Sequence, residues 1–193
     1  MIEKAANLLA SFFYEKKIYQ LEDIPEYVYG FEVLLSTVVN LFFIICLSIV
    51  TNTESGAIMF CIAFIPLRMT AGGYHATHHW SCILTFLLTY LAFVVIVHCL
   101  DAKEAIYYSF ASIIISCILV WFLAPVEAEN KTLENKHKQL QRKKSEHYCI
   151  FNLILLSIVL LIDSQHMLIM HFNYYASGAL AASCSLVAAK LLT

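Results

Sequence analysis

Long apolar runs separated by short polar links dominate the chain. Each run is close to the roughly 20 residues that a helix needs to cross a bilayer. The pattern therefore predicts an all-α integral membrane protein, with about six transmembrane helices in a single membrane domain over 1–193. The predicted spans are about 31–50, 56–70, 82–100, 105–125, 148–163 and 167–191.

Residues 1–28 mix apolar and charged positions instead of forming such a run. Apolar side chains recur at helical spacing over 5–13, with Lys4 and Lys16 outside that pattern. This predicts an amphipathic interfacial segment whose basic residues contact lipid headgroups. A short helix packed against the end of the bundle explains the pattern equally well. The segment lacks the features of a cleaved signal peptide.

The composition agrees with a membrane protein and argues against some kinds of cysteine site. Apolar residues make up 61% of the chain and charged residues 13%, against about 45–50% and about 25% in soluble domains. The mean hydropathy is +0.74. The seven cysteines form no CxxC pair, which argues against a disulfide framework or a cysteine zinc site. We therefore expect no cofactor.

The placement of positive charge predicts the orientation of the chain. If the N-terminus is cytoplasmic and the six spans are threaded in order, every Lys and Arg except Lys103 falls on the cytoplasmic side. Such a bias is typical of the positive-inside rule. It predicts cytoplasmic N- and C-termini, a cytoplasmic motif loop at 68–82 and a basic cytoplasmic loop at 127–147.

The second apolar run is short for a span. Over 56–67 it has about a dozen residues, with Pro66 near its end and Arg68 directly after it. Such a run crosses a bilayer only where the bilayer is thinned or the next segment re-enters it. Non-helical backbone at that depth is tolerated where it lines a protein cavity. We therefore expect the following polar link to be sunk below the headgroups.

The link 68–82 contains adjacent glycines, several histidines and a cysteine. A loop that only connects two helices does not need these residues. The last residue of the link, Cys82, is predicted at the start of the third span, where the helix dipole favours a negatively charged thiolate. A thiolate with a nearby histidine base is the arrangement of a cysteine nucleophile. The notable residues of the link are Arg68, Gly72, Gly73, His75, His78, His79 and Cys82.

Spacing alone leaves the choice of base open. On a continuous helix His75 would lie about 10.5 Å from Cys82 along the axis, whereas proton transfer needs about 3 Å. His78 and His79 would reach the thiol more easily, although both are as readily explained as interfacial polar residues. For His75 to act, the backbone must fold back, and the adjacent glycines permit unusual conformations nearby.

Three residues of the link allow alternative interpretations. His75 and His79 have the spacing of a metal-binding pair on a helix, but a third ligand and an HExxH pattern are not evident. Arg68 suits either a snorkelling helix-end residue or a ligand for a substrate carboxylate or phosphate.

The loop at 127–147 is rich in positive charge. Its composition predicts that it helps to orient the chain in the membrane and contacts anionic lipid. A more specific hypothesis is that it binds an acidic peptide substrate. A nucleic-acid partner does not fit so short a basic run in a membrane protein. The basic residues are Lys131, Lys136, Lys138, Arg142, Lys143 and Lys144.

Several of these residues resemble one known family. An arginine, a GGxHA-like core and a cysteine seven residues after the histidine are found here at Arg68, 72–76 and Cys82. In this pattern, and in the lysine-rich stretch after Pro125, the sequence resembles the accessory gene regulator B (AgrB) family. Those proteins are membrane cysteine endopeptidases of Gram-positive peptide quorum sensing.

The resemblance implies a specific reaction in the cell membrane. Cys82 would be the nucleophile and His75 its general base or orienter, with Arg68, Gly72 and Gly73 in supporting roles. The enzyme would cleave the acidic C-terminal tail from a short precursor peptide through a thioester acyl-enzyme. An internal cysteine or serine would then close a thiolactone or lactone ring.

The resemblance also implies partners. The basic loop would attract the acidic tail, and the family suggests a homodimer. No third catalytic residue is evident beside the motif. Two other functions remain open from the residues alone: a non-enzymatic membrane transporter or peptide exporter with a polar path, and a membrane protein that binds metal through the histidine cluster.

Overall fold

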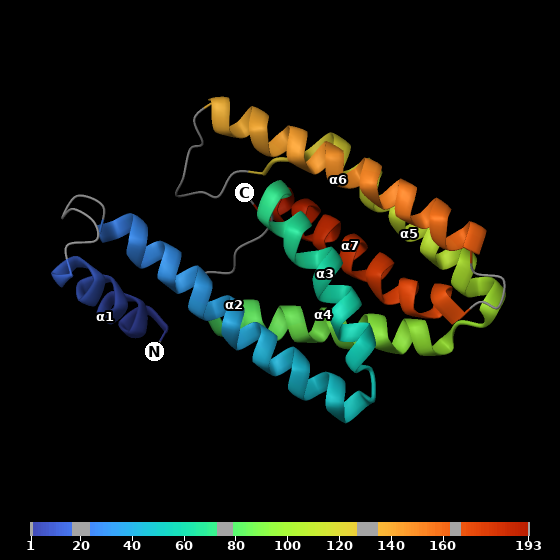
Figure 1. The fold of residues 1–193 in the computed structure, drawn as a ribbon, viewed down its shortest axis with the longest axis horizontal. Helices are drawn as coiled ribbons and strands as arrows, with labels where there is room; N and C mark the ends of the chain where they lie inside the picture. Colours follow the sequence, from blue (N-terminus) through green and yellow to red (C-terminus); the bar gives the residue numbers. More distant parts are fainter. Residues whose placement is uncertain (1, 17–23, 73–78, 127–134, 163–166, 193) are drawn as a thin grey trace. The chain divides into compact units, whose positions relative to one another are not determined.

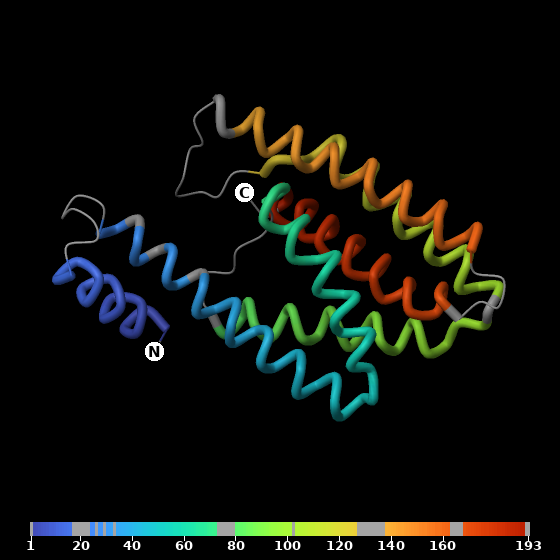
Figure 2. The backbone as a smooth tube through the Cα atoms, in the orientation of Figure 1, coloured from blue at the N-terminus to red at the C-terminus, as the bar shows by residue number. Residues whose placement is uncertain are grey.

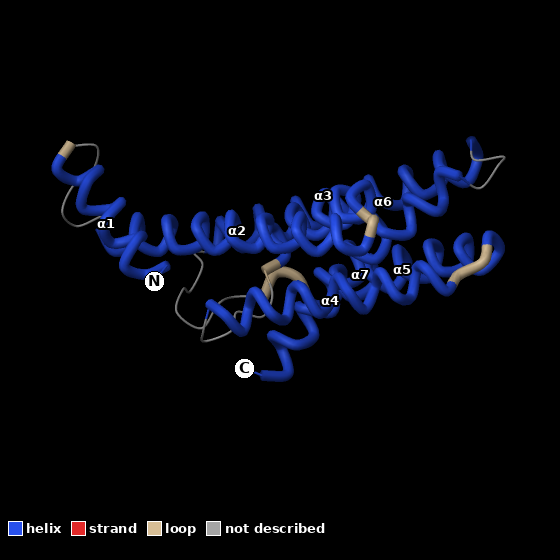
Figure 3. The backbone as a smooth tube through the Cα atoms, turned by 90° about the horizontal axis from the view of Figure 1, so that it is seen from below, coloured by secondary structure: helices blue, strands red, loops and turns tan. Residues whose placement is uncertain are grey.

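The computed structural model describes residues 2–16, 24–72, 79–126, 135–162 and 167–192. All the regular structure within these residues is helical (Figures 1 and 3). The helices are α1 (Ile2–Glu15), α2 (Ile24–Thr51), α3 (Glu54–Ala71), α4 (His79–Cys99), α5 (Ala102–Leu123), α6 (Asn135–Ile162) and α7 (Met167–Leu192).

Five of the described helices, α2 to α6, are long and apolar enough to cross a membrane. The all-α prediction and the multi-pass membrane prediction are therefore confirmed at this level. The sixth predicted span, 167–191, is also a helix, but α7 is not among the five. The number of crossings and the side of each terminus stay predictions.

The chain divides into two compact units. The first comprises Met1–Leu47 and Ala76–Leu87, and the second comprises Ser48–His75 and Leu88–Thr193. Each unit has its own packing.

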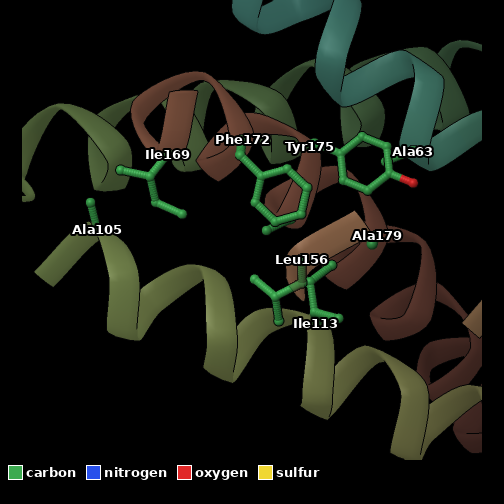
Figure 4. Close-up of a cluster of buried hydrophobic side chains, with 9 residues drawn as sticks. Ala63, Ala105, Ile113, Leu156, Ile169, Phe172, Tyr175 and Ala179 are labelled. Carbon is green, nitrogen blue, oxygen red and sulfur yellow. The ribbon is translucent and has the colours of Figure 1, made fainter. Parts of the chain in front are cut away.

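In the second unit, α7 is surrounded by its neighbours. Residues 172–179 are all buried, although helices on a surface bury only one face. A buried cluster gathers side chains of α3, α5, α6 and α7, among them Ile113, Leu156 and Phe172 (Figure 4). A side chain at Gly178 would collide with the carbonyl oxygen of Phe60, so the backbones of α3 and α7 are in direct contact. Small residues at such crossings are typical of membrane helix packing.

A seam of polar side chains joins α5 to α7 inside this core. Ser109 donates to Asn173 Oδ1 at 2.5 Å, and the hydroxyls of Tyr108 and Ser177 are 2.7 Å apart. Further along the same interface, the hydroxyls of Ser116 and Ser183 are 2.6 Å apart. Hydrogen bonds of this kind satisfy polar groups that lipid cannot solvate. They explain why α7 is less apolar than a lipid-facing helix.

In the first unit, α1 packs against α2 and also keeps exposed apolar side chains. It buries Ala6 and Ala10 completely, and Phe13 stacks on Phe31 of α2 with ring centroids 5.5 Å apart. Leu8 and Phe12 remain 72% and 52% exposed. The helix therefore packs through small and aromatic residues while keeping an apolar outer surface, which suits a membrane boundary.

Two predicted loops differ from the structure. Residues 68–71 of the predicted motif loop are helical, because α3 agrees with the predicted span 56–70 and continues through Pro66 to Ala71, over about 27 Å (Figure 2). Pro66 is exposed and lies inside this helix, where it lacks the N–H that would bond to the carbonyl oxygen of Ile62. The second span is therefore not too short to cross a membrane.

The basic loop is also shorter than predicted. From Asn135 onward its residues are helical and continuous with the apolar part of α6. Lys, Arg, Gln and Glu are good helix formers, and Arg142 and Glu146 form an i,i+4 ion pair at 3.1 Å. Charge alone had suggested a loop, but the same residues have high helix propensity.

Candidate functional site

Arg68 lies in the last turn of α3 and is half-buried. Its Nη1 donates to the carbonyl oxygen of Gly72 at 3.0 Å and to Ser185 Oγ of α7 at 3.2 Å. The last carbonyls of a helix have no partner within the helix, so Arg68 fixes the chain as it leaves α3 and ties it to α7. Neither predicted role of Arg68, snorkelling or anion binding, included this contact.

Gly72 follows α3 in a conformation that only glycine adopts easily. Its φ is +83°, in a region that L side chains rarely occupy. The backbone N–H of Val126 donates to the carbonyl oxygen of Ala71 at 2.9 Å, and Gly72 forms an isolated parallel bridge with Val126. A Cβ at position 72 would collide with the Val126 carbonyl oxygen. We call this pairing the Gly72–Val126 junction.

The junction brings the beginnings of the two polar links together. Gly72 opens the motif link after α3, and Val126 opens the basic link after α5. A buried cluster lies at the same end of the unit and contains residues from α3, the end of α5, α6 and α7. Its buried members are Leu67, Ala71, Val120, Ala124, Cys149, Ala182 and Leu186. Four segments therefore support the junction.

Cys82 lies where the sequence predicts it, at the start of a membrane helix. It is half-buried in the first turn of α4, between exposed Ser81 and buried Ile83. Trp80, two residues earlier, is 69% exposed, as expected for an aromatic residue at a membrane boundary. Cys82 belongs to the first unit, whereas Arg68 and Gly72 belong to the second.

The other motif residues are only partly described. Gly73, His75 and His78 lie outside the described residues, and His79 is the first residue of α4. The pairing of His75 with Cys82 therefore stays a prediction. In the described part of the chain, no group of three or more His, Cys, Asp and Glu side chains is placed to hold a metal ion.

The basic residues divide between the link and α6. Lys131 lies outside the described residues, and Lys136 is in the first turn of α6. Farther along the helix, four cationic residues are exposed: Lys138, Arg142, Lys143 and Lys144. The structure thus places most of this positive charge on a helix rather than on a loop.

Val126 and Ser185 are the residues that the sequence did not suggest. Ser185 is 117 positions from Arg68, and Val126 is an ordinary apolar residue after Pro125. The only signals in the sequence were the serines near the end of an alanine-rich helix and the proline shortly after α5.

Comparison with known proteins identifies one family. The family model described as Accessory gene regulator B (AgrB) matches residues 3–189, nearly the whole chain. No curated protein and no solved structure matches the chain.

Proposed function

The chain belongs to the AgrB family, and we propose that it is a membrane-embedded cysteine endopeptidase. Family membership places the protein in the processing of accessory gene regulator quorum-sensing peptides. The proposal adds the chemistry: cleavage of the acidic tail of a short precursor, followed by ring closure. The observation that carries it is the half-buried Cys82 in the first turn of α4.

Cys82 begins the reaction by attacking the peptide bond that precedes the tail. His75 accepts the thiol proton and passes it to the nitrogen of the leaving tail. The carbon–nitrogen bond breaks, and a thioester joins the rest of the precursor to Cys82. Amide groups in the first turn of a helix stabilise negative charge, which suits a sulfur nucleophile at this position.

Ring closure releases the enzyme. A thiol or hydroxyl within the bound peptide attacks the thioester carbon, and His75 accepts its proton. The bond to the Cys82 sulfur breaks, the sulfur regains the proton, and a thiolactone or lactone forms. Water must be excluded meanwhile, because hydrolysis would give a linear product.

In the proposal, the ends of α3 and α5 hold the start of the motif link. Arg68 and the Gly72–Val126 junction fix the backbone where the motif link begins. Their role in the proposal is to position the link that carries His75. We place the active site on the cytoplasmic side of the cell membrane, in a homodimer.

The proposal is tested by measuring release of the acidic tail from the precursor peptide that is encoded beside the gene of this protein. With protein in lipid, Cys82→Ala should slow release at least about a thousandfold, and His75→Ala about a hundredfold or more. Cys99→Ala is the matched control, because Cys99 is an exposed cysteine at the other end of the same helix. It should cleave at the wild-type rate. Cleavage that survives Cys82→Ala would contradict the cysteine mechanism.

A further inference from the structure

The helix α3 has a weak turn shortly before its end. Pro66 lies inside the helix and has no N–H, so it cannot bond to the carbonyl oxygen of Ile62. A helix bends most readily at such a turn. The turns that follow carry Arg68 and lead to Gly72. They therefore need support from neighbouring helices if the motif link is to begin in one fixed position.

Tyr148 of α6 gives support at this turn. Its hydroxyl donates to the carbonyl oxygen of Ala63 at 2.7 Å, and Ala63 lies in the turn that the proline leaves incomplete. Tyr148 is half-buried and packs against the buried cluster that contains Leu67 and Ala71. Hydrogen bonds between helices hold neighbouring membrane helices together. The helix α6 is thus bonded to α3 where α3 lacks a bond of its own.

Neighbouring polar side chains fix the Tyr148 hydroxyl. Tyr175 of α7 belongs with Ala63 to the other buried cluster (Figure 4), and its hydroxyl oxygen is 3.4 Å from that of Tyr148. Tyr175 in turn donates to Asn152 Oδ1 at 2.5 Å, and Asn152 is one turn after Tyr148 on α6. Satisfied polar networks in a protein interior hold their members rigidly. The network therefore keeps the Tyr148 hydroxyl directed at α3.

The end of α3 is held on both sides of the proline. Before it, Ala63 accepts the hydrogen bond of Tyr148 from α6. After it, Arg68 donates to Ser185 of α7. The two contacts are about 7.5 Å apart along the helix. Together they determine the direction in which the chain leaves α3 at Gly72.

The opposite end of α3 has a similar contact far from the site. The Tyr90 hydroxyl donates to the carbonyl oxygen of Thr53 at 3.2 Å, and the two hydroxyls are 2.7 Å apart. Tyr90 is completely buried, and Thr53 is the N-cap of α3. Thr53 precedes Gly72 by about 28 Å of helix. A tyrosine thus holds each end of α3, but only Tyr148 does so at the proline turn.

We propose that Tyr148 is a positioning residue for the acyl transfer. Its bond to Ala63 fixes the last turns of α3, and these turns fix the Gly72–Val126 junction from which the motif link begins. Tyr148 acts through α3 and does not touch the reacting atoms. The effect on catalysis rests on the proposed function, whereas the connection between Tyr148 and the junction does not.

A pair of matched substitutions tests the proposal in the full-length protein in lipid. Tyr148→Phe removes one hydroxyl and keeps the ring, and Tyr90→Phe makes the same change at the other end of α3. Both should lower the midpoint of unfolding, because each removes a hydrogen bond between helices. Only Tyr148→Phe should lower kcat for tail release, by about tenfold, with KM unchanged.

Hydrogen exchange measures the position of the helix end without catalysis. The N–H groups of Gly72 and Val126 both donate to carbonyl oxygens at the end of α3. They should exchange faster in Tyr148→Phe than in the wild type, and at the wild-type rate in Tyr90→Phe.

A Pro66→Ala background tests the role of the proline turn. The alanine restores the N–H that can bond to Ile62, so adding Tyr148→Phe should then lower kcat much less than it does beside the proline. An equal loss in both backgrounds would show that the weak turn is not the reason for the effect.

Three further results would overturn the assignment. Equal losses of kcat in Tyr148→Phe and Tyr90→Phe would show a general effect of stability. Wild-type kcat and exchange in Tyr148→Phe would remove the residue from positioning, and a rise in KM alone would assign it to peptide binding. If the exchange rates differ as expected but the wild type releases no tail, the proposed catalysis fails while the connection between Tyr148 and the junction stands.

Discussion

The helices α2 and α7 are of similar length, but α2 is largely exposed whereas α7 is largely buried. The span Gly30–Thr51 of α2 is the most apolar of the five candidates, and only 12% of its most apolar window is buried. In α7, by contrast, residues 172–179 are all buried while including an asparagine, a serine and two tyrosines. In a bilayer the surface that meets lipid must be apolar, whereas a buried surface can be polar if its hydrogen bonds are satisfied.

The comparison shows what the hydropathy of a helix measures in a membrane protein. High hydropathy indicates exposure to lipid rather than burial within the protein. The apolar runs therefore predicted the positions of α2 to α5, of the apolar part of α6 and of α7. They did not predict that α7 is the most enclosed of the described helices. Its small and hydroxyl-bearing residues were the relevant signal, because they permit close backbone contact and interhelical hydrogen bonds.

Putting a charge on the lipid-facing helix should have the largest effect. Phe42 lies near the middle of the α2 span and is 61% exposed. Phe42→Asp should oppose insertion by about 3 kcal/mol, because no partner compensates a carboxylate in hydrocarbon. Glycosylation mapping of membrane insertion measures this, with Phe42→Leu as the control. Full insertion of the Asp variant would show that this face does not meet lipid.

The same glycine substitution should act in opposite directions on the two helices. Gly178→Ala in α7 should destabilise the protein by about 2 kcal/mol, because the added methyl group meets the backbone of α3. Gly30→Ala in α2 has nothing within 4 Å and should stabilise the helix by about 0.5–1 kcal/mol. Unfolding in mixed detergent micelles compares them. Equal effects would mean that the two surroundings do not differ in packing.

Removing one hydroxyl from the buried seam should have a smaller effect. Ser109→Ala leaves Asn173 Oδ1 without its donor and should cost about 1 kcal/mol. Ser157→Ala on α6 is the control, since that hydroxyl is exposed and donates to the carbonyl oxygen of Leu153 in its own helix. The same unfolding assay applies. A Ser109→Ala variant as stable as Ser157→Ala would show that the seam does not stabilise the α5–α7 interface.

Some features of the candidate site could be predicted from the sequence, and others could not. Cys82 at the start of a helix was predictable, because an apolar run begins there. The contact of Arg68 with Ser185 and the Gly72–Val126 junction were not, since they join positions that are far apart in the chain and carry no shared pattern. From the sequence, the two adjacent glycines only permitted unusual backbone conformations near 72. The structure shows why Gly72 is needed: it has a positive φ and a backbone neighbour that excludes a side chain.

Location of the acyl group on the protein tests the central claim most directly. Wild-type protein in lipid is mixed with the precursor, quenched in acid and digested, and the modified residue is identified by mass spectrometry. The account predicts a hydroxylamine-sensitive thioester on Cys82 whose mass equals the precursor without its tail. The adduct should be absent in Cys82→Ala and present in Cys99→Ala. An adduct on another residue, or tail release while no adduct ever forms on Cys82, would contradict it.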